Sequence, residues 1–433
     1  MNIIQIIPGS GGSFYCGNCL RDSKYVDALR NLGHQVVKIP MYLPLFADEH
    51  DISDIPIFYG AISTYLKQVY PVFKKAPKWV DNLLNSKPMM KMAASMAGST
   101  RAKGLEDMTI SMLLGEQGEQ KEELDKMVTW IAEHCKPDVI HISNALLLGL
   151  AKELKAKTNV PVVCSLQDED VWVDAMQIQF QQKIWDLMHK RSDDVDALVA
   201  VSNFFADAMK KRMNLKDEKV HTFYLGVDAE DYPYIPFKEK PRNVGYISRM
   251  CHKDGFDIVV DAFIDLKKKP GFDDVKLIAT GGLTGDDKKF LKEQKNKIKK
   301  NNLENYFEII EEFEGDARHN FFKKVSMVSV PVRIGEAFGM YLLESMASGV
   351  PVVQPALGAF PEIVEISGGG VNYMPNTPEK LSETWAGLLN DPEKLEQLSI
   401  AGLKGTKEKF NIHKHASEII GLYESLNVQL RSE

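Results

Sequence analysis

Two carboxylates and two glycines stand close together in the second half of the chain, in the segment IGEAFGMYLLESMASGV. Glu336 and Glu344 are eight positions apart, which on one helix corresponds to about 12 Å of rise. Carboxylates accept strong hydrogen bonds from hydroxyl groups, and the first amides of a helix attract anions. The spacing therefore suits the two ends of a nucleotide-sugar, with its diphosphate at the helix start. Two exposed helix glutamates are the plainer interpretation, but they leave Gly335 and Gly339 unexplained.

The chain begins MNIIQIIPGSGGSFYCGNC, in which glycines and cysteines could each serve a ligand. The first two glycines of a dinucleotide fingerprint are present, but Phe14 stands where the third is needed. Cys16 and Cys19 could form half of a zinc site or a redox pair, yet no second pair stands at metal-site spacing. We therefore interpret them as packed thiols. What remains is the Gly11–Gly12 turn, where backbone amides could face an anion.

Composition excludes several classes of protein. The net charge of −7 is spread over mixed acidic and basic residues, which argues against a nucleic-acid partner. Five cysteines are too few and odd in number for a disulfide framework, so a reducing cytoplasm is expected. The longest apolar run, Ala145–Ala151, is too short to span a bilayer, which needs about 20 residues. A location on a membrane surface stays open.

Short apolar strand-like runs alternate with helical stretches along most of the chain. This order predicts parallel sheets covered by helices on both faces. The pattern restarts after 228–243, a stretch rich in proline and charge that we interpret as a linker. The sequence thus predicts an α/β protein of two doubly wound, Rossmann-like domains facing a central cleft. The expected parts are 1–230 with a helical, basic, Met-rich insert at 67–125, then 231–410, and a helix at 411–433 that packs back on the first domain.

Together these features resemble family 4 retaining glycosyltransferases of the GT-B fold. The segment EAFGMYLLE matches that family's motif of two glutamates separated by seven residues. Similar landmarks run along almost the whole chain: the Gly-Gly turn, LGHQV, PDVIH, VPVV, DALVAVS, LGVD, ISRM with DGFD, ATGG, and GVPVV with FPEIVE. The resemblance implies the GT-B fold and sugar transfer from a nucleotide-diphosphate donor.

The resemblance also implies roles for residues on the donor side. Glu344 would hold the ribose hydroxyls, and Glu336 would hold the donor sugar. Arg249 would face the diphosphate, where its charge offsets the charge that develops on the leaving group. The Gly11–Gly12 turn would face the diphosphate from the other domain. The backbone amides expected to hold sugar and phosphate with Glu336 are those around Ala337, Phe338 and Gly339.

Two positions depart from the pattern of that family. Where the family usually has a lysine before the glycine of DGFD, this chain has Asp254. Lys253 or Arg333 could supply the missing cation. After VPVV, the family commonly has a histidine near the reacting centre, whereas here Gln167 stands there, followed by Asp168.

Gln167 cannot act as a base, although it can position a sugar hydroxyl, so we assign it a catalytic positioning role. Asp168 is expected on the acceptor side. His141 in DVIHIS is a second acceptor-side candidate, with a structural role as the alternative. In retaining enzymes of this fold the departing phosphate can take the acceptor's proton, so the loss of a histidine alters positioning more than chemistry.

The resulting hypothesis is a cytoplasmic, metal-independent retaining hexosyltransferase that needs no cofactor other than its nucleotide-diphosphate sugar co-substrate. Its acceptor would be a sugar or a glycolipid, bound mainly by the first domain. One alternative is a non-catalytic nucleotide-sugar-binding protein, favoured by Asp254 and Gln167. Another is an isomerase or phosphorylase on the same fold.

The segment from Lys67 to Lys103 is basic and rich in methionine. It could be a solvated helical pair on the acceptor side. It could instead contact an anionic membrane, with Trp79 and the methionines at the interface and the lysines meeting lipid headgroups. Disorder or a protein partner is the third interpretation.

Overall fold

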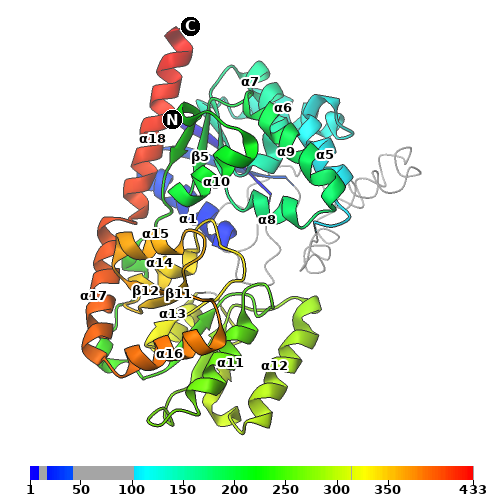
Figure 1. Cartoon of the computed structure of the whole chain (residues 1–433). Helices are drawn as coiled ribbons and strands as arrows, with labels where there is room; N and C mark the ends of the chain where they lie inside the picture. Colours follow the sequence, from blue (N-terminus) through cyan, green and yellow to red (C-terminus); the bar gives the residue numbers. More distant parts are fainter. Residues whose placement is uncertain (9–16, 42–101, 314, 433) are drawn as a thin grey trace. The chain divides into compact units, whose positions relative to one another are not determined.

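The computed structural model describes residues 1–8, 17–41, 102–313 and 315–432 (Figure 1). These residues form two units. The first is built largely from Cys19–Tyr224, with the first strand and Ala416–Glu433. The second is built largely from Leu225–His415. The segment 228–243, expected as a linker, therefore lies within the second unit, where it includes the short helices η5 (Ala229–Asp231) and η6 (Phe237–Glu239).

The first unit contains a six-stranded sheet in the order β2-β1-β3-β4-β5-β6, and all its pairings are parallel. The strands are β1 (Asn2–Ile7), β2 (Gln35–Pro40), β3 (Val139–Ile142), β4 (Val162–Leu166), β5 (Ala197–Ala200) and β6 (Val220–Thr222). Its helices are α1 (Gly17–Asn31), α5 (Glu106–Leu114), α6 (Lys121–His134), α7 (Ala151–Thr158), α8 (Glu169–Asp174), α9 (Ile178–Ser192), α10 (Asn203–Met213) and most of α18 (Ile412–Ser432).

The second unit repeats the design with the strand order β12-β11-β10-β7-β8-β9, again parallel throughout. The strands are β7 (Val244–Ile247), β8 (Leu277–Thr280), β9 (Phe307–Ile309), β10 (Met327–Val328), β11 (Val352–Pro355) and β12 (Gly370–Tyr373). The helices are α11 (Phe256–Leu266), α12 (Lys288–Lys300), α13 (Asp316–Lys323), α14 (Met340–Ala347), α15 (Phe360–Ser367), α16 (Pro378–Leu389) and α17 (Pro392–Glu408).

The two sheets confirm the predicted α/β architecture, and burial explains why the strands read as continuous apolar runs. All residues of β3, β5, β7 and β8 are buried, because helices cover both faces of a parallel sheet. Helix ends follow local rules as well. Ser202 caps α10 by accepting a hydrogen bond from the backbone N–H of Phe205 at 3.1 Å, and Asn214 ends that helix in the left-handed conformation.

The strand order also fixes where ligands can approach. In each unit the chain reverses its direction of winding between two neighbouring strands, β1 and β3 in the first and β7 and β10 in the second. Ligands of such sheets bind beyond the carboxyl ends of the strands at this reversal.

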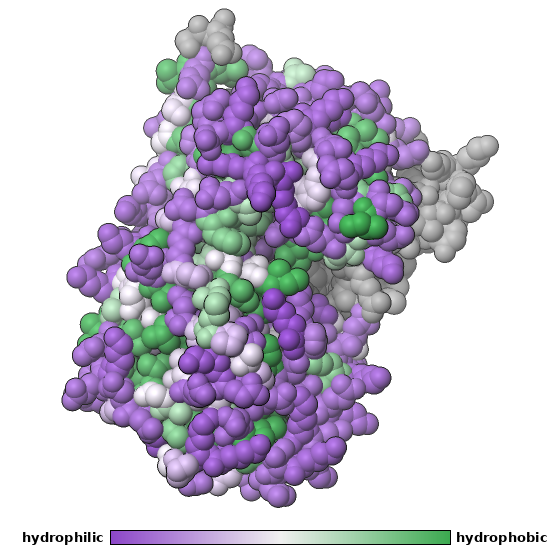
Figure 2. Space-filling model, in the orientation of Figure 1, coloured by the Kyte–Doolittle hydropathy of each residue, from purple (hydrophilic) through white to green (hydrophobic). Residues whose placement is uncertain are grey.

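In the described ranges, no helix is long and apolar enough to cross a bilayer. Hydrophilic residues cover most of the face that Figure 2 shows.

Candidate functional site

The loop between β10 and α14 contains Glu336, and it corrects one expectation. Glu336 and Glu344 do not share a helix, because α14 begins only at Met340. Gly339 precedes the helix with a φ of +95°, a conformation that disfavours other residues. The eight-residue spacing therefore does not correspond to a rise along one helix, and Glu336 is positioned by the loop instead.

Close backbone contacts hold this loop. A Cβ atom on Gly335 would lie 2.4 Å from the backbone nitrogen of Gly358, so the two glycines permit an approach that side chains would block. The N–H of Ala359 donates to the carbonyl of Glu336 at 3.0 Å. Next along the loop, Ala337 and Phe338 are buried. The glycines and these contacts leave Glu336 little backbone freedom.

Glu344 lies on α14 and is fully buried. Its Oε1 atom receives a hydrogen bond from Arg318 Nη1 at 2.7 Å and another from the Tyr232 hydroxyl at 2.9 Å. Burial and the Glu344 charge raise the pKa of Tyr232 well above its usual value, so it remains a donor. Arg318 comes from α13 and Tyr232 from the segment interpreted as a linker. Neither was identified from the sequence, which offers no local signal for either.

Arg249 follows β7 at the reversal of the second sheet, and it holds Asp287 with two hydrogen bonds. Nε donates to Oδ2 at 2.7 Å and Nη2 to Oδ1 at 3.0 Å, and Nη2 also contacts Thr284 Oγ1 at 2.9 Å. Although burial acts in the opposite direction, the bonds from Arg249 and Thr284 lower the pKa of Asp287. The Arg249 side chain is 27% exposed, so it remains accessible to a ligand.

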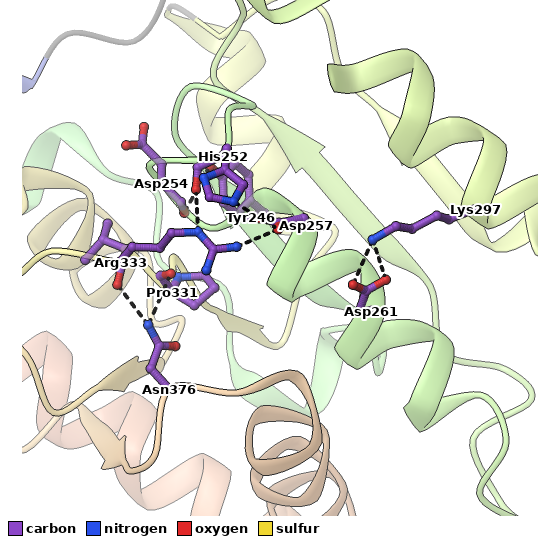
Figure 3. Close-up of polar contacts among 10 residues, drawn as sticks. Tyr246, His252, Asp254, Asp257, Asp261, Lys297, Pro331, Arg333 and Asn376 are labelled. Carbon is purple, nitrogen blue, oxygen red and sulfur yellow. Dashed lines mark hydrogen bonds and ion pairs between the residues drawn. The ribbon is translucent and has the colours of Figure 1, made fainter. Parts of the chain in front are cut away.

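Arg333 ties the loop after β10 to the loop after β7 (Figure 3). Its Nε donates to the carbonyl of His252 at 3.0 Å, and its Nη2 contacts Asp257 Oδ2 at 2.5 Å. Its backbone N–H donates to the carbonyl of Lys253, whose side chain is exposed. Two cations were candidates to replace the missing lysine. The Arg333 side chain is hydrogen-bonded to this loop and to Asp257, whereas Lys253 belongs to the loop and has an exposed side chain.

Asp254 lies in the same loop and is partly buried. Its Oδ2 accepts a hydrogen bond from Ser248 Oγ at 3.0 Å. Burial raises its pKa, against the opposing effect of the Lys253 charge. In Figure 3 its carboxyl group is directed away from Arg333.

The acceptor-side candidates lie at the carboxyl ends of β3 and β4 in the first unit. Gln167 is buried, and its Nε2 donates to the carbonyl of Ser143 at 2.6 Å. Asp168 has a φ of +56°, which is uncommon outside glycine and often marks a functional position. Glu169, which no sequence motif marks, joins the two loops because its carboxyl oxygens accept hydrogen bonds from the N–H groups of Ala145 at 2.8 Å and Gln167 at 2.6 Å.

His141 lies within β3 and is 3% exposed. Its Nδ1 is hydrogen-bonded to the Tyr423 hydroxyl of α18, and its Nε2 lies 2.8 Å from Ser165 Oγ. These contacts join the sheet to the C-terminal helix. They fit the structural alternative for this residue better than contact with an acceptor.

Some predicted features lie outside the described residues. They are the Gly11–Gly12 turn, the side chains of Cys16 and Cys19, and nearly all of the basic segment up to residue 101. Their assigned roles stay predictions.

Two family models match consecutive parts of the chain. Residues 229–405 match "Glycosyl transferases group 1", and residues 122–231 match "Glycosyltransferase Family 4". Neither model alone spans half of the chain, and together they support a glycosyltransferase function. The first model covers the unit that contains Arg249, Glu336 and Glu344.

Curated proteins similar to this chain agree with that result. An uncharacterized glycosyltransferase of Methanocaldococcus jannaschii, MJ1178, is 28% identical over 67% of this chain and 76% of its own. The lipopolysaccharide core biosynthesis mannosyltransferase LpsB of Rhizobium meliloti is 32% identical over 42% of this chain and 51% of its own. The solved structure of Anabaena HepE in complex with UDP shares the GT-B fold, with a TM-score of 0.67, 18% identity, and coverage of 98% of this chain and 100% of HepE.

Proposed function

We propose that the chain is a retaining glycosyltransferase that moves a hexose from a nucleotide-diphosphate sugar to a sugar or glycolipid acceptor. The observation that supports this most is the arrangement at the strand reversal of the second unit. There Arg249 follows β7, and the loop with Glu336 leads from β10 into α14 with Glu344. HepE, which has the same fold, was solved with UDP and with UDP-glucose.

In the proposed reaction the bond between the sugar's anomeric carbon and the diphosphate oxygen breaks. The acceptor oxygen forms the new bond on the same face, and its proton passes to the departing phosphate. Arg249 offsets the negative charge on that phosphate, and Glu336 accepts hydrogen bonds from the sugar. No other cofactor is required by this scheme.

Ribose binding by Glu344 is part of the proposal and has a structural requirement. Arg318 and Tyr232 both donate to Oε1, so these two groups orient the carboxylate that would receive the ribose hydroxyls.

The experiment is incubation of the purified protein with nucleotide-sugars and detection of released nucleotide and sugar products by mass spectrometry. Slow donor hydrolysis or transfer is expected, and Glu336→Gln should lower it by about 100-fold, in the range for loss of a charged group that stabilises a transition state. Asp261→Asn is the matched control, because it also converts a carboxylate to an amide. Asp261 lies on α11, and its carboxylate accepts a hydrogen bond from Lys297 of α12 at 2.8 Å. Intact donor in every reaction would refute transferase activity, and full activity of Glu336→Gln would refute the role of Glu336.

Contact with an anionic membrane through residues 67–103 is a separate proposal, motivated by the eight basic residues of that segment and by the glycolipid acceptor. Flotation with anionic and neutral liposomes tests it. Binding to anionic vesicles alone is expected. Equal binding after neutralisation of Lys74, Lys75, Lys78 and Lys87 would contradict the proposal.

A further inference from the structure

Four polar side chains of the second unit converge where the loop after β7 approaches the start of α14. Asp254 and Glu336 contribute carboxyl groups, and Tyr246 and Tyr341 contribute hydroxyl groups. The Tyr246 hydroxyl donates to the carbonyl of Arg249 at 2.7 Å and lies 3.4 Å from the carbonyl of Asp254. After burial, the charges of Asp254 and Glu336 both act to raise the pKa of both tyrosines. The four groups therefore lie close enough to one another to interact electrostatically.

One of these groups makes no regular hydrogen bond. The Tyr341 side chain is 3% exposed, and among the described residues its hydroxyl has no partner at hydrogen-bond geometry, although it interacts with the neighbouring Glu336 side chain. A buried hydroxyl without a partner costs free energy, so native proteins rarely retain one without a functional reason. Its ring is fixed against Phe360 in an edge-to-face contact with centroids 6.4 Å apart. The hydroxyl is thus held ready to bond a ligand beside Glu336.

The Asp254 carboxyl also has capacity to bond a ligand. Ser248 Oγ donates to Oδ2, and a carboxylate with two oxygens accepts several hydrogen bonds. The carboxyl group of Asp254 is directed away from Arg333 in Figure 3, and the guanidinium of Arg333 pairs with Asp257 instead. A pair of carboxyl groups next to a phenol suits the hydroxyl groups of a sugar. The same pair repels a second anion, because like charges at short range in a partly buried site are unfavourable.

We propose that Asp254 and Tyr341 complete the pocket for the donor's sugar with Glu336, and that the pocket selects a neutral hexose over a uronic acid. This inference rests on the proposed function and adds the class of sugar. The aspartate that replaces the usual lysine is then a specificity residue: it bonds the sugar, and the diphosphate is held by Arg249.

The test is calorimetric binding of UDP, GDP and ADP, followed by the glucose, galactose and mannose conjugates of whichever diphosphate binds, and then by a corresponding uronic acid conjugate. The measured quantity is the sugar gain, defined as the Kd of the diphosphate divided by the Kd of its best neutral conjugate. Asp254→Asn and Tyr341→Phe should each reduce this gain by about tenfold and leave the affinity for the diphosphate unchanged. The uronic acid conjugate should bind wild-type protein more weakly than the neutral one, and Asp254→Asn should narrow that difference.

The Asp261→Asn variant is again the control, since it makes the same chemical change on the neighbouring helix. Unfolding midpoints without ligand establish that each variant is folded, and Tyr341→Phe retains the ring contact with Phe360. An unchanged sugar gain in both variants would overturn the inference and leave the proposed function standing. The inference would also be overturned if wild-type protein showed no sugar gain with any neutral conjugate. It would equally be overturned if wild-type protein bound the uronic acid conjugate as tightly as the neutral one. Failure of every diphosphate to bind would overturn the proposed function itself.

Discussion

Arg318 and Glu344 form a buried ion pair, with 2.7 Å between Nη1 and Oε1 and side-chain exposures of 12% and 0%. The carboxylate lies on α14 and the guanidinium on α13. The pair fixes one of the two glutamates of the motif before any donor binds. It also makes the stability of this part of the second unit depend on both partners.

Removal of Arg318 should therefore destabilise the protein strongly. Arg318→Ala leaves a buried carboxylate without its cation, so we expect the free energy of unfolding to fall by about 3–5 kcal/mol, as measured by chemical denaturation. The double variant Arg318→Met with Glu344→Gln should regain a large part of this loss because the buried charge is gone. Equal stability of the single and double variants would contradict this interpretation of the pair.

Tyr232→Phe tests the second donor to Glu344 with a smaller expected effect. The hydroxyl bond at 2.9 Å is lost while the packing of the ring is kept, so we expect a loss of about 1.5–3 kcal/mol, typical of a bond to a charged group. Thermal unfolding measures it. Tyr234→Phe is the control, because this neighbouring tyrosine is 41% exposed. If both variants lost the same amount of stability, the hydrogen bond from Tyr232 to Glu344 would not be the cause of the loss.

Glu169 should make stability depend on pH. Its burial raises its pKa to about 8, despite the N–H groups that it accepts from, whereas an unfolded glutamate has a pKa of about 4.3. The folded state thus retains a proton that the unfolded state releases. The contribution of this group is full below about pH 4 and is lost as pH rises to about 8. Glu169→Gln should remove this pH-dependent loss of stability, because glutamine does not titrate.

The measurement is the difference in unfolding free energy between wild type and Glu169→Gln from pH 5 to pH 9. Relative to wild type, the glutamine variant should become more stable as pH rises towards 8, and the difference should level off above that value. A difference independent of pH would show that the carboxyl titrates normally. Glu119→Gln, at an exposed site in the same unit, controls for the change of charge.

Asp168 permits a separation of backbone conformation from side-chain function. Its φ of +56° costs a residue with a Cβ about 1 kcal/mol, and glycine avoids that cost. Asp168→Gly should therefore keep or raise stability while it lowers transfer activity, if the carboxylate serves the acceptor. Asp168→Asn keeps the backbone conformation, so it should lower transfer activity and leave stability unchanged. Full activity of both variants would exclude a role for the carboxylate.

The close approach of Gly335 and Gly358 predicts a sharp effect of a single methyl group. Gly335→Ala would place a Cβ 2.4 Å from the backbone nitrogen of Gly358, so the loop with Glu336 must shift. We expect weaker donor binding and a lower unfolding midpoint. Gly387→Ala in α16 is the control, because its Cβ would meet no atom within 4 Å. That change should stabilise the protein by about 0.5–1 kcal/mol.

The sheets were predictable because they depend on local patterns. Runs such as Val244–Ile247 and Leu277–Thr280 are apolar and short, and helical stretches separate them, which is typical of parallel sheets. The extent of β10 was less predictable. The sequence VSMVSVPV at 325–332 has the composition of a longer strand, but only Met327–Val328 pairs with its neighbours as a regular strand.

The sequence by itself determined the two parallel sheets and the motif with Glu336 and Glu344, because strand periodicity and glycine positions act within a few residues of the chain. The tertiary structure alone decided the partners of these groups. Tyr232 reaches Glu344 across 112 positions of sequence, and Arg249 reaches Asp287 across 38. Such pairs form only when packed helices and loops bring distant segments together, and the free energy that selects them comes from burial and charge in the folded unit.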